Sequence, residues 1–298
     1  MQKNRYKQYP LNQSPFYCLR SQQKLAKLLC ISRTKLNELT RLDDLYREKE
    51  LFNHKKKKTF PVQVPNGILM RILRRIKEIL SQVAIPSFIH SPALGRSYIT
   101  NAKAHVNSYE VRSLDIKQYF PSSQSWRVYS FFHVVMRCSP DVAGILTKLS
   151  TVNGHLPTGS PLSPVLSYFA HIDMWETINE QVEGAGCTLT VYMDDVTISG
   201  SSVPGKLIWQ IKKEFRRCGL RDNKEKEKHY VGNKPREITG VIVKDGKLNV
   251  PNRQRQKMHE CRQAIKQETE NAEKEHLVQS LKGLESQAQQ IQKANKGM

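Results

Sequence analysis

Residues 188–200 read TLTVYMDDVTISG, two runs of apolar and β-branched side chains separated by a short polar turn. Such runs are typical of β-strands, so the stretch predicts a β-hairpin. Its tip carries two adjacent carboxylates, Asp194 and Asp195. Aspartate is common in turns because it suits their backbone geometry, and that is the simplest interpretation of the pair. The apolar flanks, however, would bury most of the hairpin, and carboxylates buried close together repel unless a cation separates them.

A third carboxylate, Asp115, ends another predicted strand. Residues 110–116 read EVRSLDI, and this alternation of polar and apolar side chains favours a short β-strand. Acidic side chains at the ends of strands in a basic chain indicate a site for divalent metal. Mg2+ prefers oxygen ligands, and a pair of such ions can hold the attacking and leaving oxygens of a phosphoryl transfer. The carboxylates therefore predict a nucleotidyl transferase or a nuclease.

The composition of the chain points to a polyanionic partner. The 298 residues include 48 Lys and Arg against 27 Asp and Glu, a formal net charge of +21. The length suits one large domain or a few packed subdomains. No apolar run approaches the roughly 18 residues of a membrane span, and no apolar segment of a secretory signal follows the N-terminus. The six cysteines form no CxxC pair, which argues against a disulfide framework or a zinc site. We expect a cytoplasmic protein with reduced thiols.

Helical and strand patterns surround the two acidic segments. The sequence predicts a pair of helices over residues 21–42, with Ser32 as a cap, and an amphipathic helix over residues 69–83. A second hairpin is expected between them, with a lysine run at its tip that could contact phosphates: Lys55, Lys56, Lys57 and Lys58. Further helices are expected at 125–150, from about 165, at 204–218 and over the last 45 or so residues, with a loop at 156–164 and a hairpin at 236–250 that turns at Asp245 and Gly246.

Four short segments together resemble the motifs of reverse transcriptases. Each match is weak by itself, but all four occur in the family's order and at similar spacing, over roughly residues 110–230. The segments are LDIKQYFPS at 114–122, LPTGSPLSP at 156–164, YMDD at 192–195 and GLRDNKEK at 219–226. They resemble the LDIxxFFPS, LPQGxxxSP, YxDD and GLxxNxxK motifs, respectively.

Two further segments are similar to elements of retron reverse transcriptases. Residues 101–105 read NAKAH, which resembles the NAxxH element, and residues 238–240 read ITG, which resembles the VTG element. The resemblance assigns retron-specific, RNA-related positions to Asn101, Ala102, His105, Ile238, Thr239 and Gly240. The chain ends 58 residues after Gly240, which is expected to leave room for a small thumb but not for a ribonuclease H, integrase or endonuclease domain.

The resemblance implies an α/β (α+β) fold of the right-hand polymerase type. It divides the chain into N-terminal helices and fingers at residues 1–110, a palm with the catalytic carboxylates at 111–240, and a small helical thumb at 241–298.

It also implies roles for individual residues. Asp115 and Asp194 would ligate two Mg2+ ions, with the Ile116 carbonyl close by and Asp195 completing the acidic group. Phe120, next to Tyr119, would crowd the 2′ position of an incoming nucleotide and so favour dNTPs. Other expected contacts to the nucleotide come from Thr158, Gly159 and Lys226.

Two positions depart from the family pattern. Thr158 stands where the family often has a glutamine that contacts the nucleotide, and Phe60 stands where an arginine of the fingers is expected.

The implied function is that of an RNA-directed DNA polymerase of a retron. Such an enzyme copies part of a structured non-coding RNA (msr-msd) into branched msDNA, using dNTPs and starting from the 2′-OH of a guanosine. It would act with a separate effector or toxin protein in antiphage defence. The alternatives are another bacterial reverse transcriptase (abortive-infection, diversity-generating or intron type), a non-catalytic RNA-binding scaffold or antitoxin, and a DNA-binding regulator that uses the N-terminal helices.

Overall fold

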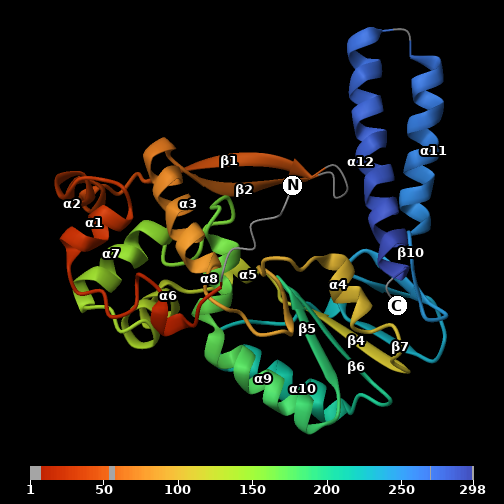
Figure 1. The fold of residues 1–298 in the computed structure, drawn as a ribbon, viewed down its shortest axis with the longest axis horizontal. Helices are drawn as coiled ribbons and strands as arrows, with labels where there is room; N and C mark the ends of the chain where they lie inside the picture. Colours follow the sequence, from red (N-terminus) through yellow and green to blue (C-terminus); the bar gives the residue numbers. More distant parts are fainter. Residues whose placement is uncertain (1–7, 54–57, 269, 297–298) are drawn as a thin grey trace.

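A five-stranded sheet, with the strand order β3-β5-β6-β4-β7, lies at the centre of the chain (Figure 1). The structure is a computed structural model and describes residues 8–53, 58–268 and 270–296. The bounds of the strands, in sheet order, are Ile89–Ser91 (β3), Thr188–Tyr192 (β5), Asp195–Gly200 (β6), Glu110–Asp115 (β4) and Lys228–Val231 (β7). Strand β3, from the segment assigned to the N-terminal helices and fingers, pairs parallel to β5, and the other pairs are antiparallel.

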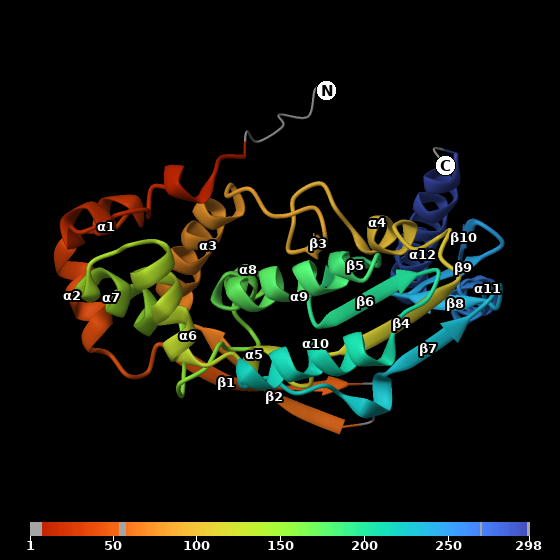
Figure 2. The ribbon, with the colours of Figure 1, turned by 90° about the horizontal axis from the view of Figure 1, so that it is seen from below.

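The β5–β6 hairpin confirms the prediction from residues 188–200. Tyr192 pairs with Asp195, so Met193 and Asp194 form a two-residue turn, in which Met193 has a positive φ of 60°. The middle of each strand is buried. Two helices, Ile172–Gly184 (α9) and Gly205–Arg217 (α10), pack against each other and cover one face of the sheet (Figure 2).

The N-terminal part of the chain is helical with one long hairpin. Its elements are Leu11–Gln13 (η1), Gln22–Leu28 (α1), Arg33–Arg41 (α2), Tyr46–Asn53 (β1), Lys58–Pro65 (β2) and Gly67–Ser81 (α3). The Ser32 side chain accepts a hydrogen bond from the Lys35 N–H and caps α2, as predicted. Strands β1 and β2 pair along their whole length in a separate sheet. The lysine run was predicted to contact phosphates. Lys55, Lys56 and Lys57 lie outside the described residues, and the side chain of Lys58 is not described either.

Two helical predictions are confirmed in type and divided in detail. The helical region predicted at residues 125–150 consists of Ser125–Ser130 (α6), a π-helical turn at Phe131–Val135 (η2) and Pro140–Ser150 (α7). Arg137 has a positive φ of 54° and Pro140 starts α7, so the helix cannot run through this point. The helix expected from about residue 165 begins earlier, as Ser163–Ala170 (α8), and His171 separates it from α9. A short helix, Tyr119–Ser122 (α5), follows β4.

The C-terminal part combines a small sheet with a helical hairpin. Its strands are Arg236–Ile238 (β8), Val241–Lys244 (β9) and Lys247–Asn249 (β10). The turn at Asp245 and Gly246 is confirmed, and both residues have positive φ. Helices Asn252–Gln267 (α11) and Asn271–Asn295 (α12) then form an antiparallel pair that projects from the body of the molecule (Figure 1).

Two hydrophobic cores hold these parts together. The large core runs through α1–α3, α6–α10 and the inner strands of the central sheet. The small core joins helix α4 (Tyr98–Lys103) and β4 to the C-terminal sheet and α12. Its members are Ile99, Ala102, Val106, Val111, Ile238, Val241, Val243, Leu248, Val250 and Ile291. Among the described residues, no helix is long and apolar enough to cross a membrane.

Candidate active site

The register of three strands brings Asp115, Asp194 and Asp195 together. Asp115 and Asp195 are directly paired across β4 and β6. Asp194 lies in the turn between β5 and β6, and its carbonyl oxygen accepts a hydrogen bond of 2.9 Å from the Ile116 N–H. The C-terminal end of β4 and the tip of the β5–β6 hairpin therefore meet at the same end of the sheet. This is the grouping that the sequence predicted.

The three carboxylates are close enough to perturb one another. Burial raises the pKa of Asp195 to about 6, and the negative charges of Asp194 and Asp115 add to that increase. Burial is also the largest cause of the raised pKa of Asp194, with Asp115 again contributing. The positive charge of Lys226 opposes both increases. The nearby lysine thus only partly compensates the negative charge of the three carboxylates.

Asp115 is held by two side chains from the segment after α10. The Asn223 amide donates a hydrogen bond of 3.1 Å to its Oδ1, and Lys226 Nζ lies 2.6 Å from its Oδ2. The pKa of Lys226 is raised, chiefly by this bond. Lys226 lies in a short 3-10 helix, Lys224–Lys226 (η3). The sequence singled out Lys226 but assigned no role to Asn223, although it lies inside the GLRDNKEK segment.

The donor set suits a hard divalent cation. No three His, Cys, Asp or Glu side chains are arranged to hold a metal ion as they stand in the part of the chain that the structure describes. Asp115 is bound by Lys226 instead. All three acidic side chains nevertheless offer oxygen. The pKa values of Asp194 and Asp195 are raised by burial and, to a lesser extent, by repulsion between the carboxylates, and a bound cation would offset both. Asp115, Asp194 and Asp195 could therefore hold such an ion if the Lys226 amine moves away.

A cavity of about 470 Å³ adjoins Asp194, one of the three carboxylates. Its walls come from four separate segments: β2, α5, the loop before α8 and the turn between β5 and β6. The residues that line it include Phe60, Gln63, Tyr119, Phe120, Thr158 and Asp194. Phe120 is partly buried, and its ring stacks on that of Tyr119 with the centroids 6.0 Å apart. The Tyr119 hydroxyl donates to the Ser167 carbonyl oxygen at 3.0 Å, which fixes the ring behind the cavity.

The two predicted residues of the 156–164 loop lie against strand β2. The Thr158 hydroxyl donates to Gln63 Oε1 at 3.2 Å, and the Gly159 N–H donates to the Gln63 carbonyl oxygen at 3.1 Å. A Cβ atom on Gly159 would lie 2.5 Å from that oxygen, so only glycine permits this approach. The carboxamide of Gln63 thus lies next to Thr158. Position 158 is the one at which the family often has a glutamine. No motif or spacing in the sequence pointed to Gln63.

The two retron-like segments contact each other across 138 residues of chain. The Asn101 amide donates to the Thr239 hydroxyl at 3.3 Å, and that hydroxyl donates to the Tyr98 carbonyl oxygen at 3.0 Å. Ala102 and Ile238 are both members of the small core, and Gly240 follows Thr239 with a positive φ of 83°.

His105, the last residue of the NAKAH segment, is buried in the central sheet. Its ring nitrogens lie 2.6 Å from the hydroxyls of Ser199 and Thr190. Burial lowers the pKa of His105 to about 3, so the ring is neutral at ordinary pH. The imidazole therefore fastens the segment that contains Asn101 to strands β5 and β6.

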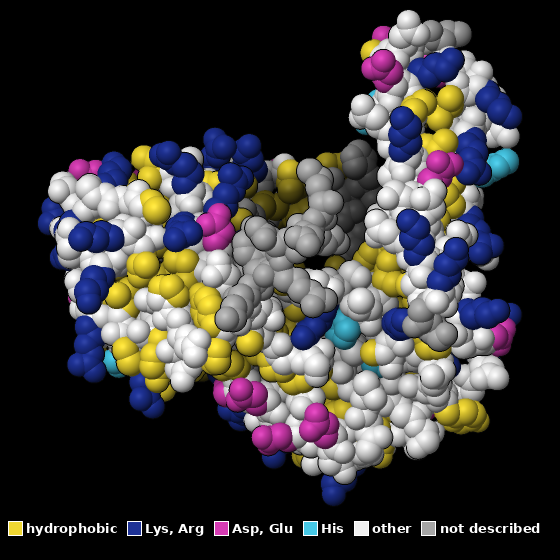
Figure 3. Space-filling view, in the orientation of Figure 1, with side chains coloured by type: hydrophobic (Ala, Val, Ile, Leu, Met, Phe, Trp, Pro, Cys, Tyr) yellow, Lys and Arg dark blue, Asp and Glu magenta, His cyan; other side chains and the backbone are white. Residues whose placement is uncertain are grey.

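Lysine and arginine side chains are spread over the N-terminal helices and over the α11–α12 hairpin (Figure 3). On α11 they include the exposed residues Arg253, Arg255 and Lys257. These two basic regions lie on opposite sides of the site (Figures 1 and 3). The distribution matches the polyanionic partner that the net charge predicts.

Comparisons with known proteins agree with this geometry. Residues 54–243 match the reverse transcriptase (RNA-dependent DNA polymerase) family. The chain is 28% identical over 246 residues to the retron Se72 reverse transcriptase of Salmonella heidelberg (strain 579083-10), covering 78% of this chain and 65% of that protein. It is 26% identical over 128 residues to the retron Ec86 reverse transcriptase of Escherichia coli, covering 43% of this chain and 40% of that protein.

A third relative is the retron Mx65 reverse transcriptase of Myxococcus xanthus, which is 26% identical over 203 residues, covering 61% of this chain and 47% of that protein. The chain thus spans less than two thirds of the length of these relatives. The family match covers most of the chain and includes Asp115, Asp194 and Asp195. The resemblance predicted from the short motifs is confirmed: the chain belongs to the reverse transcriptase family and is similar to its retron members.

Proposed function

We propose that the chain is an RNA-directed DNA polymerase that makes the branched msDNA of a retron. The observation that carries this proposal is the juxtaposition of three carboxylates with a cavity lined by Phe120 and Thr158. A site for phosphoryl transfer and a space for a nucleotide are thereby adjacent. The match to the family supports the same reaction.

The arrangement of the chain supports a right-hand layout. Residues 1–110 would supply the N-terminal helices and fingers, with β1–β2 as the part that reaches the nucleotide. The palm would comprise residues 111–240 together with the edge strand β3, and the thumb would be residues 241–298. Template and product would lie between β1–β2 and α11–α12, where basic side chains flank the site (Figure 3).

Within this layout, Asp115, Asp194 and Asp195 would hold two Mg2+ ions, with the Ile116 carbonyl beside them. When bound, Mg2+ supplies positive charge to the attacking and leaving oxygens of the transfer. Lys226 would release Asp115 and offer charge or a proton to the departing pyrophosphate. Phe120, backed by Tyr119, would crowd the 2′ position of the nucleotide, and Thr158 and Gly159 would form the opposite wall.

The retron-like segments would bind the RNA partner. The contact between Asn101 and Thr239 supports a common surface for the retron-like segments, on which a structured msr-msd RNA would rest. The accessible part of that surface would come from Lys103 and Ala104 and from Thr239 and Gly240. The buried residues of the two segments would hold it in place: Asn101, Ala102, His105 and Ile238. Synthesis would start from the 2′-OH of a guanosine in this RNA, and a separate effector protein would join the enzyme and its msDNA in antiphage defence.

The deciding experiment isolates the protein expressed from its own locus and examines the nucleic acid bound to it. We expect a small DNA joined to RNA, from which a debranching enzyme releases the RNA. In the double variant Asp194→Asn plus Asp195→Asn, the yield of this DNA should fall by at least about 100-fold, because transition-state charge is no longer stabilised. Asp43→Asn, at an exposed carboxylate, is the matched control. Absence of branched DNA from the unaltered protein, or its persistence in the double variant, would overturn the proposal.

Phe120→Ala tests the nucleotide pocket separately. Removing the ring should relax the preference for dNTPs over NTPs in primer extension, while the exposed Trp126→Ala serves as an aromatic control. Unchanged discrimination would remove Phe120 from this role.

A further inference from the structure

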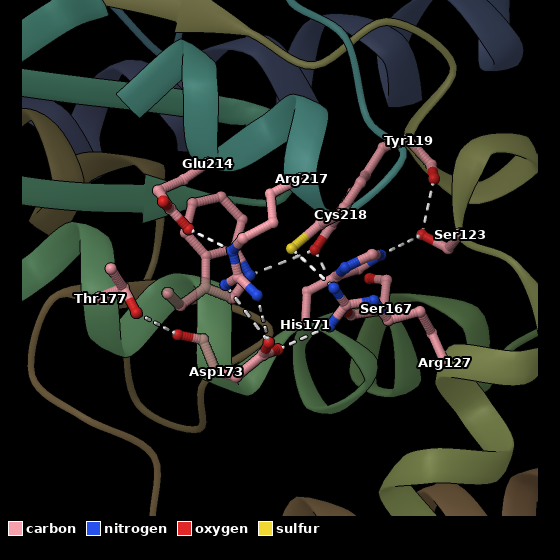
Figure 4. Close-up of polar contacts among 11 residues, drawn as sticks. Tyr119, Ser123, Arg127, Ser167, His171, Asp173, Thr177, Glu214, Arg217 and Cys218 are labelled. Atoms are coloured by element: carbon pink, nitrogen blue, oxygen red, sulfur yellow. Dashed lines mark hydrogen bonds and ion pairs between the residues drawn. The ribbon is translucent and has the colours of Figure 1, made fainter. Parts of the chain in front are cut away.

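A buried chain of hydrogen bonds connects Tyr119, the neighbour of Phe120 in the chain, to Ser123 and His171 (Figure 4). The Ser123 hydroxyl donates to the Tyr119 carbonyl oxygen at 2.7 Å, and His171 Nε2 lies 3.1 Å from the same hydroxyl. Both Ser123 and His171 are completely buried. Figure 4 shows Ser123 between Tyr119 and His171. None of the motif resemblances assigns a role to either residue.

The directions of these bonds follow from the number of protons present. A serine hydroxyl has one proton, and Ser123 gives it to the Tyr119 carbonyl, so it must accept from His171. The His171 ring is neutral, because burial lowers its pKa to about 3. Its single proton is therefore on Nε2. No hydrogen-bond partner for Nδ1 exists among the described residues, so the bond to Ser123 is the ring's only hydrogen bond within them.

Ser123 also joins the two walls of the cavity through its backbone. Its N–H donates to the Phe120 carbonyl oxygen at 3.0 Å, and its own carbonyl oxygen accepts from the Leu156 N–H at 3.0 Å. Phe120 is one wall of the cavity, and Leu156 leads into the loop that carries Thr158, the other wall. Ser123 thus bonds both to the residue of one wall and to the start of the loop that carries the other.

His171 is in turn fixed by charged groups on three helices. It lies at the junction of α8 and α9, two residues before Asp173. Asp173 forms a 2.8 Å ion pair with the buried Arg127 of α6 and a 3.3 Å ion pair with Arg217 of α10. Figure 4 shows these side chains converging on Asp173. The imidazole therefore projects from a rigid base toward the cavity wall.

We propose that His171 and Ser123 are positioning residues that set the gap between Phe120 and the Thr158 loop, and thereby the discrimination between dNTPs and NTPs. The inference rests on the proposed polymerase function. An apolar side chain could fill the place of His171 without the cost of burying an imidazole whose Nδ1 has no partner among the described residues. The retained polar group is accounted for by its bond to Ser123, which no apolar side chain could make.

The test measures kcat/KM for a dNTP and for the matching NTP in primer extension. In Ser123→Ala and in His171→Leu, the ratio of the two values should fall about two- to tenfold, the range expected for one lost hydrogen bond. The double variant should fall no further than the larger single effect, because both residues act through one chain of bonds. His171→Gln retains an N–H near the place of Nε2 and should restore most of the ratio. Thr147→Val, which removes a hydroxyl bonded to the Ala143 carbonyl in α7, should leave the ratio unchanged.

The outcomes separate the two proposals. If the unaltered protein makes no DNA, the polymerase function and this inference both fail. If it makes DNA and the Ser123→Ala ratio equals that of Thr147→Val, only the positioning role is overturned. Additive effects of Ser123→Ala and His171→Leu would also overturn it. Should His171→Leu fail to fold, Ser123→Ala and His171→Gln decide the question by themselves.

Discussion

The two hydrophobic cores differ in size and in what they hold. The large core packs α1–α3 and α6–α10 against the inner strands, and it includes Tyr119 of the cavity lining, with Phe120 packed against it. The small core fastens the C-terminal sheet and α12 to helix α4. Strand β4 belongs to both, since Leu114 lies in the large core and Val111 in the small one, and Asp115 ends this shared strand.

The helical hairpin is attached less firmly than the elements that carry the site. Helix α11 contributes no buried residue, and Ile291 is the only buried residue of α12 among those described. The side chain of Asn295 adds a pair of 2.9 Å hydrogen bonds to the backbone of Leu248. The helical hairpin is therefore attached through a small area, and we expect it to move on the body while the carboxylates and the cavity stay fixed.

The largest effect should come from truncating one side chain in each core. Leu73→Ala, at a fully buried position of the large core, should lower the free energy of global unfolding by about 2–5 kcal/mol. Ile291→Ala should instead loosen α11 and α12, visible as faster hydrogen exchange there, and weaken binding of a primer–template duplex. Its main thermal transition should stay close to that of the unaltered protein. An equal loss of global stability in both variants would mean that the cores unfold as one unit.

A smaller effect is expected where β2 meets the loop before α8. In Gly159→Ala the new Cβ would lie 2.5 Å from the Gln63 carbonyl oxygen and 2.7 Å from Val62 Cγ1, so strand and loop must separate. We expect a loss of about 1–3 kcal/mol in stability and a several-fold higher KM for dNTPs, with duplex binding retained.

The matched control is Gly144→Ala in α7, where no atom lies within 4 Å of the added Cβ. Alanine favours the helix there, and stability should rise by up to about 1 kcal/mol. A normal KM in Gly159→Ala would show that this contact does not shape the cavity.

The smallest effect concerns the pH dependence of stability at the join between the cores. The pKa of His105 is about 3 in the folded protein and 6.5 ordinarily, so below pH 6.5 only the unfolded chain takes up this proton. Stability from this residue is complete above pH 6.5 and is lost as the pH falls. Between pH 7 and pH 5, the free energy of unfolding of the unaltered protein should fall by about 2 kcal/mol more than that of His105→Gln. Chemical denaturation at the two pH values measures this difference. The exposed His259→Gln should keep the full slope, and an equal slope in His105→Gln would contradict the argument.

The sequence was most informative where function requires particular residue types in close succession. Alternating apolar runs predicted the strand that ends at Asp115 and the hairpin whose turn carries Asp194, and the strand register brings these residues together. It was silent on Gln63 and His171, whose partners lie 95 and 48 residues away, because periodicity shows which side chains are buried but not what they meet. The helical region predicted at 125–150 is confirmed, but its division was not foreseen, because apolar spacing continues across a break that backbone geometry imposes at Arg137 and Pro140.

The anchoring of α12 has a practical side. Ile291 and Asn295 both lie in the last turns of this helix, so fraying of that end would release the whole hairpin. Affinity tags and fluorescent fusions are therefore better placed at the start of the chain than at its end. A tag joined directly after α12 would lower the yield of nucleic-acid-bound protein without touching a single residue of the acidic site.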